Sequence, residues 1–150
     1  AADPFAGWQS VRVDNQTSVK ADDYEVHLHL ATAATAPAND KAFYVYVVPW
    51  VYDGSTWYEC ANFGTTTLPT GAEGTASMSD PNSMKGPYVM SYFVTSQVLS
   101  GYFNIAAMCG GIGPDGWSLA CRNCTGAALL DDSPGTELVI AYRAITYTNA

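Results

Sequence analysis

The cysteines are the residues whose type and spacing first suggest a chemical site. Cys121 and Cys124 form a C-x-x-C pair, while Cys60 and Cys109 lie alone elsewhere in the chain. A tetrahedral zinc ion can be held by thiolates, but structural zinc sites usually contain two such pairs. A redox-active pair needs a helix N-terminus to lower its thiol pKa, and this pair follows an expected strand. The pattern favours structural cysteines. In a secreted protein Cys60 could pair with Cys109, although sequence alone does not give the connectivity.

Two histidines on one face of an expected strand are the second candidate site. Residues 24–30 alternate strictly between apolar and polar side chains, which places His27 and His29 on the polar face together with Glu25. Such a pair could chelate a metal ion, with Glu25 or Asp23 as a further ligand. Histidines on the polar face of a sheet are more often solvated or paired with neighbours. The sequence therefore predicts neither a metal site nor a cofactor.

The acidic residues and serines offer no catalytic arrangement. The aspartates fall in expected turns, where Asp forms local backbone hydrogen bonds, whereas a glycosidase needs two carboxylates on the walls of a cleft. No serine stands in a G-x-S-x-G sequence, and no glycine-rich loop opens a helix. The sequence therefore predicts a protein that is not an enzyme. The sequons at 15–17 and 123–125 are of a kind that often occurs by chance.

Aromatic residues around one hairpin are the strongest surface signal. Trp50, Tyr52, Trp57 and Tyr58 flank Asp53-Gly54, a dipeptide that favours a tight turn between two strands. On a β-domain such a cluster can stack on a sugar or pack against another protein. The alternative is that Trp50 and Trp57 pair across the two strands in the core.

The composition limits the partners. The 150 residues suit one domain, and charged residues make up only 13%, about half the usual share. The 6 basic and 14 acidic residues give a net charge of −8, which disfavours binding to nucleic acids and to anionic membranes. No apolar run reaches the roughly 20 residues that a membrane helix needs. With so little charge, we expect part of the surface to be covered by partner proteins.

The elements that position these residues are expected to be strands. Residues 43–48 form an unbroken run of valines and aromatics, which predicts a strand in the middle of a sheet, with Pro49 ending its regular pairing. No segment predicts a convincing helix. The expected fold is an all-β, antiparallel, jelly-roll-like β-sandwich of about eight strands. These strands lie within 11–13, 24–30, 43–48, 50–52, 56–58, 88–94, 102–108, 117–122 and 138–147, with a short one near 75–78.

The first ten residues lack any periodicity and are predicted to be an extended N-terminal arm. Residues 11–150 are expected to form a single β-sandwich domain. The aromatic residues of the arm would then contact a neighbouring subunit. Together with the hairpin they define the predicted interface, which consists of Pro4, Phe5, Trp8, Trp50, Tyr52 and Trp57.

Two parts of the chain carry a family resemblance. The first runs from Ala38-Asn39-Asp40-Lys41-Ala42 into Phe43-Tyr44-Val45-Tyr46-Val47. The second comprises Gly116-Trp117-Ser118-Leu119, Arg122-Asn123, Thr125-Gly126-Ala127-Ala128-Leu129 and Tyr142-Arg143-Ala144-Ile145-Thr146-Tyr147. In this order the chain resembles small structural proteins of tailed bacteriophages over about two thirds of its length. It departs from their pattern at Cys124, in the extra Cys60 and Cys109, and in a longer 61–87 loop.

The resemblance implies a non-catalytic component of the virion, assembled in the host cytoplasm. Its partners would be copies of itself and a major capsid or tail protein. A compact domain with an aromatic arm fits a capsid decoration (cement) protein best. The alternatives are a tail or head-fibre component, or a secreted, disulfide-stabilised adhesin or carbohydrate-binding domain.

Overall fold

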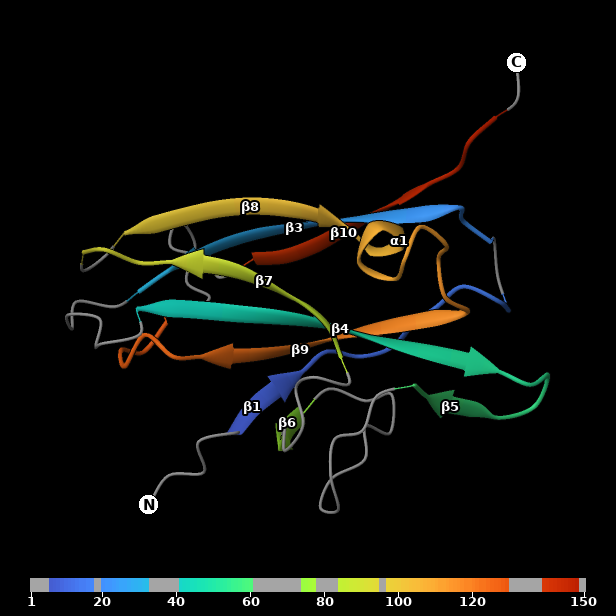
Figure 1. Ribbon diagram of the computed structural model, residues 1–150, viewed down its shortest axis with the longest axis horizontal. Coiled ribbons are helices and arrows are strands. Elements are labelled where there is room, and N and C mark those ends of the chain that lie inside the picture. The colour runs from blue at the N-terminus through green and yellow to red at the C-terminus, as the bar shows by residue number, and fades with distance from the viewer. Residues whose placement is uncertain are drawn as a thin grey trace.

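The protein folds as an antiparallel β-sandwich (Figure 1). The computed structural model describes residues 6–17, 20–32, 41–60, 74–77, 84–94, 97–129 and 139–148. Within them lie ten strands, in a sheet of seven and a sheet of three, and one helix of four residues. The predicted all-β, antiparallel sandwich is confirmed.

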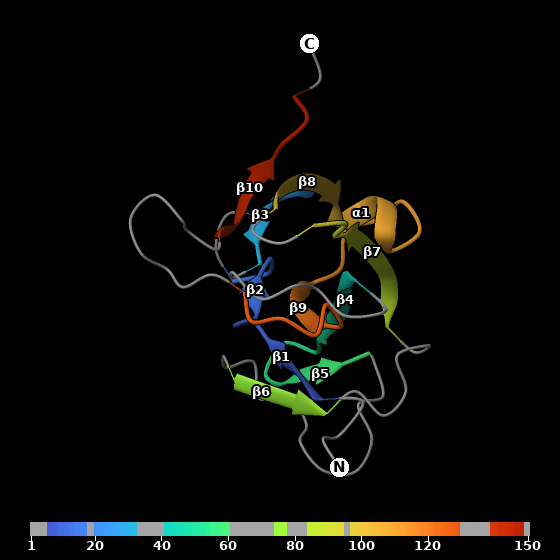
Figure 2. The same cartoon turned by 90° about the vertical axis from the view of Figure 1, so that its left-hand side faces the viewer.

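The larger sheet has the strand order β5-β4-β9-β1-β6, with β7 pairing to β4 and β2 to β9. The smaller sheet has the order β10-β3-β8, and Figure 2 shows the two sheets as stacked layers. The larger sheet contains β1 (Ala6–Gln9), β2 (Val13–Asp14), β4 (Ala42–Tyr52), β5 (Trp57–Glu59), β6 (Gly74–Ser77), β7 (Lys85–Ser91) and β9 (Gly116–Asn123). The smaller contains β3 (Asp23–Ala31), β8 (Val98–Asn104) and β10 (Val139–Ile145), and the helix α1 (Ile105–Met108) follows β8.

Strand β4 lies inside the larger sheet and is buried on both faces, as its continuous apolar run predicts. Phe43, Val45 and Val47 belong to the core between the sheets. Tyr46 and Val48 point to the opposite face, where they join a second buried cluster. Burial on both faces explains why this segment does not alternate between apolar and polar residues.

The prediction that Pro49 ends the regular pairing of β4 is wrong. The strand continues to Tyr52, and Pro49 lies opposite Trp117 of β9. On its other edge the Pro49 carbonyl accepts a hydrogen bond from the Cys60 N–H at 2.8 Å. The N and C=O of one residue face the same edge in an antiparallel strand. The Pro49 nitrogen therefore faces the edge at which the partner of β4 changes from β7 to β5. No residue of β7 or β5 is paired with Pro49 there, so none loses a hydrogen bond through the missing N–H.

Strand β3 has the predicted register. Its apolar residues from Tyr24 to Leu30 are buried, while His27 and His29 are exposed and Glu25 is half-buried. The strand lies between β10 and β8, so its backbone is paired on both edges. The alternation therefore assigns one face to the core and the other to solvent.

The end of β8 differs from the prediction, which extended a strand over residues 102–108. The strand ends at Asn104, and the next four residues form α1. Asn104 makes no side-chain cap to this helix. The carboxylate of Asp23 on β3 instead accepts a hydrogen bond from the Ala106 N–H at 2.8 Å and from the Asn104 side-chain amide at 2.9 Å. The capping group thus comes from a distant part of the chain, which a local pattern cannot reveal.

The last residues of the predicted N-terminal arm belong to a sheet in the structure. Ala6–Gln9 form β1, which pairs with β6 on one edge and with β9 on the other. Gln9 is buried, and the Ser10 N–H donates to the Leu119 carbonyl at 2.9 Å. These residues are therefore part of the sheet.

Deleting residues 1–9 is expected to lower the melting temperature by about 5 °C or more. The deletion removes β1 and leaves the edges of β6 and β9 unpaired. Thermal unfolding followed by circular dichroism measures the change, and deletion of residues 1–5, which keeps β1, is the matched control. An unchanged melting temperature for the longer deletion would contradict a structural role for β1.

Candidate functional site

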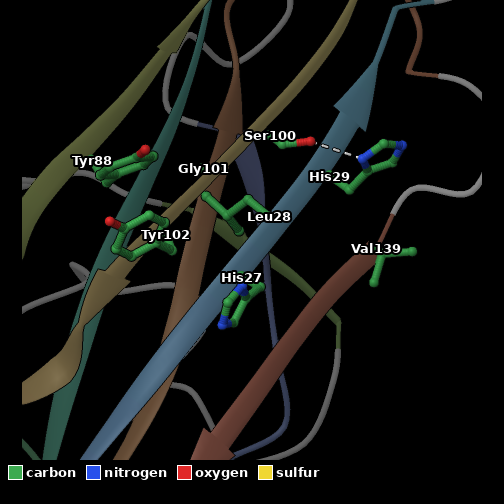
Figure 3. Close-up of a pocket in the computed structure, with 8 residues that line it drawn as sticks. All are labelled: His27, Leu28, His29, Tyr88, Ser100, Gly101, Tyr102 and Val139. Atoms are coloured by element: carbon green, nitrogen blue, oxygen red, sulfur yellow. Dashed lines mark hydrogen bonds between the residues drawn. The ribbon is translucent and has the colours of Figure 1, made fainter.

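A shallow groove on the smaller sheet brings the two sequence-predicted histidines together with other polar side chains (Figure 3). Its volume is about 560 Å³. The histidines and Leu28 come from β3, and the remaining residues come from the neighbouring strands β8 and β10 and from β7. The lining consists of His27, Leu28, His29, Tyr88, Ser100, Gly101, Tyr102 and Val139.

The polar side chains of this groove bind one another across the strands. His29 Nδ1 lies 2.9 Å from the Ser100 hydroxyl, and these two residues are directly opposite in the β3–β8 pairing. His27 contacts the Glu25 carboxylate, which also accepts a hydrogen bond from Arg143 at 2.9 Å. These contacts pair the polar side chains of a solvent-exposed sheet face with one another. They agree with the interpretation of the histidines as structural residues.

The Ser100–His29 contact lacks the remaining parts of a nucleophilic site. A serine nucleophile needs a histidine whose other ring nitrogen is oriented by a third group. Among the described residues, the one carboxylate bonded to a histidine is Glu25, and it binds His27 instead. The described part of the chain also contains no group of three or more His, Cys, Asp or Glu side chains that could hold a metal ion.

The cysteines form no disulfide in this structure. Three of their thiols have a raised pKa and are therefore not activated as nucleophiles. Burial raises the pKa of the Cys121 thiol to about 12. Burial also raises the pKa of Cys109 and of Cys60, and at Cys60 the neighbouring Asp115 and Glu59 add to the effect. A thiol with a raised pKa supplies little thiolate at neutral pH. The geometry agrees with structural cysteines.

We expect Cys60 to react with a thiol reagent in the native protein and Cys121 to react only after unfolding. Cys60 is exposed, whereas Cys121 is buried on β9. Burial both blocks access to Cys121 and, by raising its pKa to about 12, keeps its thiol protonated at pH 8. Mass spectrometry of protein treated briefly with iodoacetamide identifies the modified residue, and Cys60→Ser is the control. Rapid labelling of Cys121 in the folded protein would contradict its burial.

The aromatic hairpin is arranged differently from the predicted surface cluster. Trp50 is 3% exposed and its indole donates to the Ser118 hydroxyl at 3.0 Å, so it cannot form the surface contact predicted for it. Trp57 lies opposite Tyr52, with ring centroids 4.8 Å apart, and not opposite Trp50. The Arg12 guanidinium lies 4.3 Å from the Trp57 ring centroid. The partly buried Tyr52–Trp57 pair is thus partly covered by a cation.

The predicted interface also included three residues of the N-terminal segment, Pro4, Phe5 and Trp8. Trp8 on β1 is 36% exposed and remains available at the surface. Pro4 and Phe5 lie outside the described residues. The exposed aromatic of the hairpin is Tyr58, which was not among the predicted interface residues.

The turn of this hairpin is held by one carboxylate. Asp53 Oδ1 accepts hydrogen bonds from the backbone N–H groups of Ser55 at 2.9 Å and Thr56 at 2.8 Å. These bonds, that of Thr56 foremost, hold the pKa of Asp53 below its ordinary value of 3.8. The Asp-Gly signal therefore predicts the hairpin correctly, and the aspartate is the residue that closes it.

The stabilising effect of the Asp53 charge is expected to disappear in acid. A carboxyl group whose pKa is lower in the folded than in the unfolded state stabilises above its unfolded pKa, and this stabilisation is lost as the pH falls through the folded pKa. Wild type should therefore exceed Asp53→Asn in melting temperature at pH 7, and the two should converge as the pH falls below 3.8. A constant difference across this range would show that the charge is not involved.

The closing N-x-T-G-A sequence is a structural turn after β9. Asn123 accepts a hydrogen bond from the Thr125 N–H at 3.0 Å and donates to the Ala127 carbonyl at 2.8 Å. Gly126 has φ of 71°, a conformation that favours glycine. The other sequon asparagine, Asn15, is buried and bonded to Ala21 and Tyr24. Both sequon asparagines use their side chains in bonds that hold the local backbone.

The surface feature that the sequence did not reveal is an apolar loop between β7 and β8. Phe93 is 73% exposed, and Val94 beside it is also exposed. Their backbone N–H groups both donate to the Gln97 side-chain oxygen, at 2.9 and 3.4 Å. The residue pattern predicts a strand through Val94, which would have hidden one of these side chains in the core. The strand ends at Ser91 instead.

Comparisons with protein-family models, curated proteins and solved structures give no significant match for this chain. Within the described ranges, no helix has the length and apolar character to cross a bilayer.

Proposed function

We propose that the protein is a non-enzymatic structural protein of a tailed-bacteriophage virion, and that it decorates the capsid through contacts with copies of itself and with the major capsid protein. The resemblance of the sequence to small structural proteins of tailed bacteriophages supports the assignment to a virion. The exposed apolar loop between β7 and β8 is the observation that carries the contact function. Low charge and the lack of a catalytic arrangement in the described residues support the same assignment.

The β7–β8 loop has the properties of a docking surface. Phe93 and Val94 present apolar side chains to solvent, while Gln97 fixes the backbone that carries them. A backbone held by hydrogen bonds loses less entropy on binding than a free one, and exposed apolar patches commonly mark protein contacts. Val89 and Val98, on the strands at either side, are exposed as well. The loop can therefore insert into a neighbouring protein of the capsid surface.

The carbohydrate-binding alternative receives less support from the hairpin. A sugar-binding platform needs aromatic rings with open faces. Trp50 is buried, and the Arg12 guanidinium lies against Trp57. A tail or head-fibre component would share the docking properties of the loop, so the experiment distinguishes it.

Binding to phage heads tests the proposal. Purified protein is mixed with heads assembled from the major capsid protein encoded in the same genome, and the particles are sedimented. We expect wild type to sediment with the heads to saturation. Replacing Phe93 and Val94 together by serine should reduce binding about tenfold or more. Val51→Ser, at an exposed valine on β4, is the matched control and should bind like wild type.

Two results would overturn the proposal. Wild type that stays in the supernatant would exclude capsid decoration, and association with purified tails instead would favour the tail alternative. Binding to heads that is equally strong for the double-serine variant would show that the β7–β8 loop is not the contact.

A further inference from the structure

The smaller sheet ends on one side in an open strand edge. β10 pairs with β3 through an unbroken register, from Val139 opposite His29 to Ile145 opposite Asp23. No described strand pairs with its other edge, and residues 141–144 are all exposed. Figure 2 shows β10 on the side of the sandwich away from β7. A row of backbone N–H and C=O groups is therefore open at this side.

β10 also lacks the features that usually keep an edge strand from pairing. Natural proteins protect such edges with proline, lysine, a bulge or a covering segment. β10 contains neither proline nor lysine, and its register with β3 has no bulge. The opposite edge of the sheet, on β8, is flanked by β7, whose Tyr88 packs against Phe103 with ring centroids 5.2 Å apart. Of the two edges, that of β10 is the one open to another strand.

The alternation of the backbone identifies which groups of β10 are open. The Ile145 carbonyl accepts a hydrogen bond from the Asp22 N–H at 2.9 Å, so the backbone of Ile145 faces β3. The N–H and C=O of one residue face the same edge of an antiparallel strand, and successive residues face opposite edges. The backbone groups of Ile140, Tyr142 and Ala144 therefore face the open edge.

The charges on β10 allow a second copy of the same strand to lie beside it. Arg143 is the only charged residue of this strand, and it donates to the Glu25 carboxylate at 2.9 Å. An antiparallel pair with its twofold axis at Tyr142 places Arg143 opposite Ala141 of the second copy, so like charges do not meet. With the axis at Arg143 the two arginines would lie opposite each other, which disfavours that register.

We propose that two copies of the protein associate through β10, which joins their smaller sheets into one continuous sheet. The pairs 140–144, 142–142 and 144–140 would form about six backbone hydrogen bonds. Tyr142 is 54% exposed, and its ring is held 5.2 Å from that of Trp117, so the two Tyr142 rings meet across the axis with little loss of freedom. This inference deepens the self-contact of the proposed function, although the dimer forms without a capsid.

Sedimentation velocity over a series of protein concentrations measures the association. We expect wild type to change from monomer to dimer as its concentration rises. Ala144→Pro removes an N–H that faces the open edge and is not used in the pairing with β3, a position where proline is tolerated. This variant should keep the circular dichroism spectrum of wild type and dimerise at least about tenfold more weakly. Ala144→Ser keeps the N–H and, as the matched control, should dimerise like wild type.

A single cysteine on the axis tests the register. In the dimer the two copies of residue 142 have Cα atoms about 5.5 Å apart, within the range that a disulfide spans. The two copies of residue 144 are offset by about 13 Å along the strands, which is too far. In a Cys60→Ser background, Tyr142→Cys should therefore give a covalent dimer on oxidation with diamide, while Ala144→Cys should not.

The dimer is overturned by wild type that remains a monomer across the concentration series, or by Ala144→Pro that dimerises as tightly as wild type. Equal cross-linking of Tyr142→Cys and Ala144→Cys would also overturn it, because the contact would not follow the register of paired β10 strands. The head-binding experiment is independent of these results. A monomer that still saturates phage heads would overturn the dimer and leave the proposed function standing, while a dimer that does not bind the heads would do the reverse.

Discussion

Replacing Leu28 by alanine is expected to lower the free energy of unfolding by about 2–5 kcal/mol. Leu28 is buried in the middle of β3, opposite Ile140 of β10 and Gly101 of β8. Both edges of β3 are held by backbone pairing, so the sheet cannot close around the missing atoms. Urea denaturation measures the loss, which includes both the removed contacts and the cavity left behind.

The neighbouring residue is the control for this prediction. His29→Ala should change the stability by less than about 0.5 kcal/mol, because His29 is exposed and loses only its contact with Ser100. A larger loss for His29→Ala than for Leu28→Ala would show that β3 has the opposite register. Stabilisation of the wild type, but not of His29→Ala, by added zinc would instead identify a metal site.

Replacing Asp23 by alanine is expected to cost about 2–4 kcal/mol. Asp23 is buried, and its carboxylate accepts hydrogen bonds from the Ala106 N–H and the Asn104 side chain. The bonds join β3 to the end of β8 and the start of α1. Alanine would leave these donors unpaired in a buried place, and each unpaired donor carries its own desolvation cost.

Two further variants separate this effect from a general loss of charge. Asp22 is exposed and accepts a bond from the Tyr147 N–H, so Asp22→Ala should cost much less than Asp23→Ala. Asp23→Asn keeps one oxygen acceptor but presents an amide to the Asn104 amide, and should fall between wild type and Asp23→Ala. A cost for Asp22→Ala as large as that for Asp23→Ala would contradict the bridging role of Asp23.

Local patterns predicted the parts of the fold that depend on local burial. The alternation around Leu28 identifies the faces of β3, because one face meets the other sheet and one meets water. The continuous apolar run from Phe43 to Val48 identifies β4 as an inner strand, because both of its faces are covered. Gln9 shows the limit: β1 has no periodic pattern, and its place between β6 and β9 depends on pairing with distant strands.

The candidate sites depended even more on distant contacts. Trp50 reads as a surface residue beside a hairpin, but Ser118 of β9 supplies the acceptor that allows its indole to be buried. The exposed Phe93 results from β7 ending at Ser91, where its pairing with β4 also stops. Likewise, the open edge of β10 results from its pairing with β3, which lies far away in the sequence.

The pairing of β10 with β3 has a consequence for how the chain acquires its structure during synthesis. Asp23 pairs with Ile145, so the smaller sheet is completed only when β10, the last described strand, has left the ribosome. Until then β3 has one unpaired edge, and such edges invite association with other chains. Folds built on pairings between distant residues also form slowly. A nascent chain that stalls before β10 therefore exposes the unpaired edge of β3 to association with other chains. Protection by a chaperone matters most during that interval.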